Sequence, residues 1–162
     1  MKLLPLLAAA AALLLAGCAS TVEECDPTTG DVSLIKKFNC KYSGTYDKRV
    51  DMKEQTLAHE KELNTEFKAA LAAIEKEKSL VNADLKTQQA SQKALNQSMN
   101  NLLVQARAKS KNRSDIQARI NTIEKQLKES QNSPEQSTME KQLELENLKN
   151  QVMDLQTDLG LK

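Results

Sequence analysis

The thiol and imidazole side chains, which bind zinc and, for thiols, carry redox chemistry, number four in this sequence: Cys18, Cys25, Cys40 and the single histidine, His59. A structural zinc site needs about four ligands grouped at short spacings, and His59 is distant from the cysteines along the chain. A redox pair usually has the Cys-x-x-Cys spacing, and Cys25 and Cys40 lie much farther apart. The spacing therefore favours neither a metal site nor a redox site, and no cofactor is expected.

No group of residues has the types and spacing of a catalytic site. The sequence has no glycine-rich phosphate loop, and its acidic residues are spread along predicted helices. His59 falls at an outward position of the heptad pattern described below, where it has no partner to act with as a base. We therefore expect a protein that is not an enzyme.

The segment that ends at Cys18 has the pattern of an export signal. Met1 and Lys2 form a short positive start, and residues 3–15 are almost entirely Leu and Ala. This run has the length of a signal-peptide hydrophobic region and is too short to span a bilayer, which takes about 20 apolar residues. Leu15-Ala16-Gly17-Cys18, at its end, resembles the lipobox of bacterial lipoproteins.

The resemblance implies that residues 1–17 are removed and that Cys18 becomes the lipidated first residue. Loss of Lys2 would bring the 23 basic residues level with the 22 acidic ones, and a neutral chain argues against nucleic acid as a partner. Acyl chains, worth about 0.8 kcal/mol per buried methylene, would hold the protein on the membrane. Ala19 and Ser20 lack the aspartate that keeps lipoproteins in the inner membrane, so the resemblance implies the periplasmic face of the outer membrane.

With Cys18 acylated, Cys25 and Cys40 remain as a pair. In an oxidising compartment such a pair favours a disulfide, although unpaired or intermolecular cysteines are the alternative. The bond would close a loop of about 16 residues and stabilise it by roughly 3 kcal/mol. We expect a small lipidated segment over residues 18–45, with an apolar cluster of Val32, Leu34, Ile35 and Phe38, and a hinge at residues 42–45.

From residue 46 onward the sequence predicts a long helix. Glycine is absent until Gly160, and helix-favouring Ala, Gln, Lys, Glu and Leu dominate. Apolar residues recur at steps of four and three, the pattern of a coiled-coil seam. The residues in this register are Val50, Leu57, Phe67, Leu71, Ile74, Val81, Leu85, Leu95, Met99, Leu102, Ala106, Ile116, Ile120, Ile123 and Leu127. A single helix over residues 46–130 would be about 130 Å long.

Polar residues interrupt this seam at Lys78, Gln88, Gln92, Lys109 and Arg113. Such residues weaken packing but can fix register and oligomeric state. Ser114-Asp115-Ile116-Gln117 also matches a capping box, so a break near residues 110–114 is the alternative to one continuous helix. The unbroken heptad register favours continuity.

A last helix is predicted over residues 134–160, because Ser133-Pro134-Glu135-Gln136 has the residues of a helix start. It presents one apolar face, made of Leu145, Leu148, Val152, Leu155 and Leu159. Residues 85–114 carry only basic charges, whereas residues 135–162 are mainly acidic. We therefore expect this helix to fold back antiparallel on residues 103–130, with Asp154 and Asp158 near Arg107, Lys109 and Lys111.

The basic run of Arg107, Lys109, Lys111 and Arg113 could bind an anionic envelope partner, such as cell-wall polymer, lipopolysaccharide or phospholipid headgroups. The favoured alternative is a solvated hinge or an intramolecular partner of the acidic last helix, which belongs to the same chain.

A lipidated N-terminus, a helical rod and a terminal lysine are together similar to the Braun-type outer-membrane lipoproteins. In that family the terminal lysine is joined to peptidoglycan, which would imply wall attachment through Lys162. This chain departs from the family in its greater length, its cysteine pair and its fold-back, and Gly160-Leu161-Lys162 lacks a basic-aromatic ending. An ordinary frayed terminus is therefore favoured.

The sequence thus predicts an all-α protein: a long helical coiled coil with a C-terminal helical fold-back and a small N-terminal disulfide-closed segment. The first functional hypothesis is a structural scaffold or tether in the cell envelope that self-associates or pairs with another helix. The alternative is a regulatory binding module, an adaptor for a cell-wall enzyme or a secretion component.

Overall fold

Helix-favouring residues dominate the chain, and the computed structural model describes residues 21–28, 33–131 and 137–161. The described residues form five helices and no strand, which confirms the all-α class. The helices are α2 (Leu34–Tyr42), α3 (Thr45–Ser79), α4 (Leu85–Lys109), α5 (Ser114–Gln131) and α6 (Thr138–Asp158). The chain divides into two compact units, Met1–Thr56 and Leu57–Lys162. The proposed signal peptide, Cys18 and Lys162 lie outside the described residues.

The first unit contains the predicted disulfide. Cys25 and Cys40 are bonded, with their Cα atoms 5.8 Å apart, and both are fully buried. Ser33 begins α2 by accepting a hydrogen bond from the backbone N–H of Lys36 at 3.3 Å. The predicted hinge is a tight turn into α3, in which Gly44 has a φ of +66°, a left-handed conformation that favours glycine.

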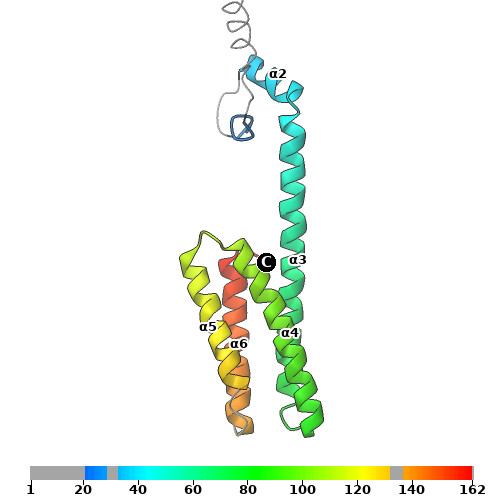
Figure 1. Ribbon diagram of the computed structural model, residues 1–162, viewed down its shortest axis with the longest axis vertical. Helices are drawn as coiled ribbons and strands as arrows, with labels where there is room; N and C mark the ends of the chain where they lie inside the picture. The colour runs from blue at the N-terminus through cyan, green and yellow to red at the C-terminus, as the bar shows by residue number, and fades with distance from the viewer. Residues whose placement is uncertain (1–20, 29–32, 132–136, 162) are drawn as a thin grey trace, which may run out of the picture. The chain divides into compact units, whose positions relative to one another are not determined.

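The second unit is a bundle of four helical segments, in which the C-terminal part of α3 is joined by α4, α5 and α6 (Figure 1). Successive segments run antiparallel (Figure 1). Polar contacts join each segment to the next and α6 back to α3: Glu62–Gln105, Arg107–Glu124, Arg119–Asp154 and Asn64–Gln156. The C-terminal fold-back is therefore present, and it closes a four-membered ring of helices.

The core of the bundle is built from the predicted seam. Each helix contributes residues at steps of four and three, as in α6 with Leu145, Leu148, Val152 and Leu155. Most seam residues of α3, α4 and α5 are buried: Phe67, Ile74, Val81, Leu95, Met99, Leu102, Ala106, Ile116, Ile120, Ile123 and Leu127. The seam prediction is wrong at Val50, Leu57 and Leu85, which are exposed.

The prediction of one helix over residues 46–130 is wrong, because the chain turns at residues 80–84. Asp84 caps α4 by accepting hydrogen bonds from the Thr87 N–H (3.1 Å) and hydroxyl (2.6 Å). The Gln88 side-chain amide donates to the carbonyls of Val81 (2.8 Å) and Ala83 (2.9 Å). These side chains satisfy the backbone groups that a helix end leaves unpaired, and so Gln88 is a turn residue rather than an interruption of a seam.

A second turn follows at residues 110–113. The continuous helix that the heptad register favours is therefore wrong here as well. Ser110 ends α4 with its N–H on the Ala106 carbonyl. The Gln117 amide donates to the carbonyls of Arg107 and Ser110, each at 3.1 Å. Gln117 therefore caps the end of the preceding helix, whereas the capping-box interpretation had assigned it to the start of its own helix.

The last helix begins and ends with well-formed caps. The predicted start at residues 133–136 lies outside the described residues. The helix α6 begins with a capping box between Ser137 and Glu140. At its end Gly160 has a φ of +71°. The Leu161 N–H then bonds the Gln156 carbonyl at 3.1 Å, which is the Schellman arrangement. Leu161 is buried in the core.

The expected pairing of α6 with the basic run is wrong in register. Asp154 and Asp158 both pair with Arg119 on α5, at 3.3 Å and 3.1 Å. Lys109 instead pairs with Glu60 on α3, and Arg107 pairs with Glu124 on α5. The register differs because the chain turns at residues 110–113, so Arg107 and Lys109 belong to α4, whereas Asp154 and Asp158 of α6 pair with Arg119 of α5.

Candidate functional site

The heptad pattern of the bundle becomes polar toward one end. In α3 the series Leu63, Phe67, Ala70 and Ile74 continues at the next step with Glu77, of which 1% is exposed. In α6 the series that contains Leu145 and Leu148 starts one step earlier with Lys141. The ammonium of Lys141 lies 2.8 Å from Glu77 Oε1. Glu77 and Lys141 therefore form an ion pair at core positions of two neighbouring helices.

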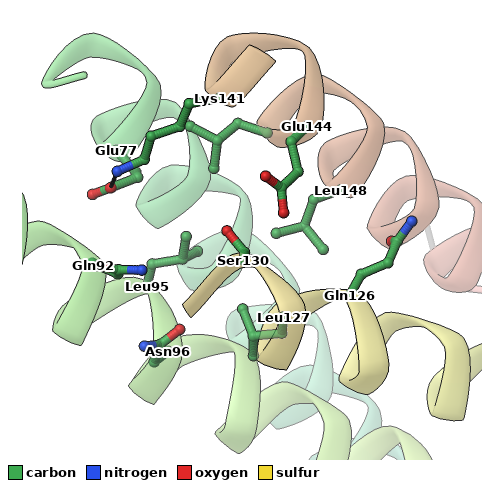
Figure 2. Close-up of a pocket in the computed structure, with 11 residues that line it drawn as sticks. Glu77, Gln92, Leu95, Asn96, Gln126, Leu127, Ser130, Lys141, Glu144 and Leu148 are labelled. Atoms are coloured by element: carbon green, nitrogen blue, oxygen red, sulfur yellow. Dashed lines mark ion pairs between the residues drawn. The ribbon is translucent and has the colours of Figure 1, made fainter. Parts of the chain in front are cut away.

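Further polar residues join this pair around a small cavity (Figure 2). We call the polar layer the set Glu77, Gln92, Gln126, Ser130, Lys141 and Glu144, all of which line the cavity. Figure 2 shows the carboxylate of Glu144 and the hydroxyl of Ser130 turned toward the same space. The cavity has a volume of about 20 Å³, which is enough for about one water molecule and too small for an organic substrate.

The polar layer contains buried atoms with unmet hydrogen-bonding capacity. The ion pair lacks hydrogen-bond geometry, since neither oxygen of Glu77 accepts a well-aligned hydrogen bond in the described residues. Glu144 Oε2 and Gln126 Oε1 are also buried without such a partner there. Only Glu77 of this layer is fully buried, and the other five residues are half-buried. Polar groups at core positions destabilise a core relative to apolar ones, but they can select one register and one pairing of helices.

Sequence reasoning missed the polar layer, although the signal was present. The step-of-four-and-three series points to Glu77 in one helix and to Lys141 in another. These two residues carry opposite charges at core positions, whereas the predicted seam register contains Lys78 in place of Glu77. Their pairing across 64 positions of sequence becomes predictable only when the turns at residues 80–84 and 110–113 are known.

The predicted basic run is largely engaged in contacts within the chain. Arg107 pairs with Glu124 at 2.8 Å and Lys109 with Glu60 at 2.7 Å. Arg113 pairs with Asp115 through two contacts, at 2.8 and 3.2 Å. Lys111 is exposed. An anionic partner for this run stays a prediction, and it would compete with three existing ion pairs.

Several of these pairs shift the pKa of their members. The guanidinium of Arg113 lowers the pKa of Asp115 to about 2. The ammonium of Lys109 lowers the pKa of Glu60. In the first unit, the hydroxyl and N–H of Thr28 lower the pKa of Asp26 to about 2, with a smaller effect from Arg49. These carboxylates are partly exposed, with 27%, 43% and 65% of the side chains of Asp26, Glu60 and Asp115 accessible, and the lowered pKa values mean that their charged forms are favoured in the folded protein.

The remaining predicted residues do not come together. His59 is half-buried on α3, and in the described part of the chain no three metal-ligating side chains form a cluster. The described helices also include none that is long and apolar enough to cross a membrane.

The structure describes three of the four residues expected to form an apolar cluster beside the disulfide, and all three are exposed. Leu34, Ile35 and Phe38 are 84%, 77% and 62% exposed, and Val32 lies outside the described residues. The disulfide is on the opposite side of α2, because Cys40 is the buried residue of that helix. The bond therefore fixes α2 without covering its apolar face.

Comparison of the chain with protein-family models, with curated proteins and with solved structures gives no match.

Proposed function

We propose that this chain is a lipid-anchored envelope protein in which Cys18 holds a self-contained helical bundle at the periplasmic face of the bacterial outer membrane as a tether or scaffold. The observation that carries the proposal is the bundle itself. One chain supplies all four helical segments of the core, and the cavity within it has room for about one water molecule. A self-contained core of this kind suits mechanical or positioning work.

The disulfide supports the envelope part of the proposal. Cys25 and Cys40 are bonded, and structural disulfides persist in oxidising compartments such as the periplasm. The lipobox resemblance at residues 15–18 supplies the anchor.

The test is the chemical state of the mature N-terminus. The full chain would be expressed in a Gram-negative host and its mass measured after membrane extraction. We expect a first residue Cys18 that carries acyl chains, and we expect the Cys18→Ser variant to be unacylated and to leave the outer-membrane fraction. A mature chain that starts elsewhere, or that carries an unmodified Cys18, would contradict the anchor.

A second candidate, an adaptor for an envelope protein, is favoured by apolar side chains that the bundle leaves outside its core. Val104, Met139 and Leu143 are 70%, 78% and 67% exposed. Sedimentation of the purified protein separates the candidates. A stable oligomer favours the scaffold, whereas a monomer that captures an envelope protein in a pull-down favours the adaptor.

A further inference from the structure

The short helix α2 has an apolar face that is turned outward. Its members Leu34, Ile35, Phe38 and Tyr42 are 84%, 77%, 62% and 77% exposed. Their spacing places them within an arc of about 100° on one side of a helix. The rings of Phe38 and Tyr42 contact each other with centroids 4.4 Å apart, and together they form a continuous apolar surface on this side.

The disulfide holds α2 from behind. Cys40 is the buried residue of this helix, and a helical wheel places it on the side opposite Phe38. The bond to Cys25 therefore prevents α2 from rotating its apolar face inward. The apolar face is consequently a persistent surface of the first unit.

The charges of α2 indicate what this face contacts. The helix contains Lys36, Lys37 and Lys41 and no acidic residue. Lys37 and Lys41 lie three residues from Leu34 and Phe38, respectively, so they border the apolar face. Lysines in this position can extend their charged ends to anionic headgroups while their stems cover apolar surface. A second copy of α2 would instead bring these lysines together, and like charges would oppose the contact.

We propose that α2 lies in the headgroup region of an anionic phospholipid membrane, with Leu34, Ile35, Phe38 and Tyr42 inserted and the lysines on phosphate groups. The inference rests on the proposed anchoring, because Cys18 would place α2 next to a bilayer. It goes further in assigning a second attachment point to the chain. An apolar face bordered by basic residues is the usual composition of an interfacial helix. Attachment through Cys18 would hold α2 near the bilayer and so raise its effective concentration there, and the two attachments together would bind more strongly than either alone.

A tryptophan reporter tests this inference, since the sequence contains no tryptophan. The Phe38→Trp variant of the full chain would be purified from the host and reconstituted into vesicles of phosphatidylethanolamine and phosphatidylglycerol. We expect a blue-shifted emission that is quenched by lipids with brominated acyl chains. The added substitutions Lys36→Glu, Lys37→Glu and Lys41→Glu should remove most of the quenching. The Val104→Trp variant is the matched control at an exposed apolar position, and it should keep the emission of a solvated ring.

Two readouts separate this inference from the anchor. Flotation with vesicles and the mass of the N-terminus report acylation, while the fluorescence reports α2. A chain that is acylated and floats, but whose tryptophan at position 38 emits as in water, would overturn the inference and leave the anchor intact. A blue shift without quenching by brominated lipid would also overturn it, because protein would then cover the ring. If the chain proves unacylated, titration with the same vesicles decides: quenching upholds the inference, and its absence overturns it.

Discussion

Glu77 has 1% of its surface exposed, and its carboxylate forms an ion pair with the ammonium of Lys141. We expect Lys141→Met to lower the free energy of unfolding by about 3 kcal/mol, because removing the half-buried ammonium leaves the buried carboxylate of Glu77 uncompensated. Urea denaturation measures the change. A loss below about 0.5 kcal/mol, the scatter of ordinary surface changes, would show that Glu77 is compensated in another way.

The double variant Glu77→Leu with Lys141→Leu is the matched control for this pair. An apolar pair at two core positions removes both desolvation penalties, so we expect stability near that of the unchanged protein or above it by about 1–4 kcal/mol. If the pair selects register, this variant should also populate alternative pairings of helices, visible as extra species in NMR spectra or as oligomers in sedimentation.

Asp115 provides a prediction about acid. Arg113 holds its pKa at about 2 in the folded protein, whereas an unfolded aspartate titrates near about 4. The stabilising effect is therefore complete above the unfolded pKa and is lost as the pH falls through the folded value. We expect Asp115→Asn to flatten the dependence of unfolding free energy on pH between about 4 and 2. An unchanged slope over that range would contradict the assignment.

At the scale of the elements, the two turns of the bundle share a device. Gln88 and Gln117 each donate two hydrogen bonds to backbone carbonyls that precede their own helix: Gln88 to the turn carbonyls of Val81 and Ala83, and Gln117 to the carbonyls of Arg107 and Ser110 at the end of α4. We expect Gln88→Ala and Gln117→Ala each to lower stability by about 1–2 kcal/mol, because carbonyls would lose their donors. Gln97→Ala, at an exposed position of α4, is the control and should stay within about 0.5 kcal/mol. Equal effects at all three positions in thermal unfolding would contradict the capping role.

The elements also show why the sequence was sufficient for the seam and insufficient for the turns. Burial follows local periodicity, and so most seam residues were predicted correctly, including Ile116 and Leu127. The predicted register runs on across both turns, because Val81 in the first turn and Leu95 after it, and Ala106 and Ile116 on either side of the second turn, are all buried. The heptad register therefore gives no indication of either turn. For the turn at residues 80–84, the capping residues Asp84 and Gln88 are the better indication in the sequence.

The candidate sites were predictable to different degrees. The bond between Cys25 and Cys40 followed from counting the cysteines and from the compartment that the lipobox implies. The exposed face of α2 could not be predicted in this way. A disulfide shows which two residues are joined, but it does not show which side of the helix faces the protein. The pair Glu77–Lys141 required knowledge of which helices are neighbours, and that depends on long-range packing.

At the scale of the whole molecule, the two units should respond separately to reduction. The disulfide lies in the first unit and the shared core of α4, α5 and α6 in the second. The bond closes a loop worth roughly 3 kcal/mol, so reduction should accelerate hydrogen exchange in α2. Amides of α5 and α6 should keep their protection. Faster exchange throughout the bundle after reduction would show that the units are coupled.

The position of α6 in the chain has a consequence for biosynthesis. Leu145, Leu148, Val152 and Leu155 are essential parts of the core, and they are made after the other three helical segments. A nascent chain therefore cannot complete its core while the ribosome is still adding α6, and the finished bundle forms only afterwards. A polypeptide that stays open until this late moment can still be threaded through a narrow translocation channel, which is the route that the proposed export signal requires.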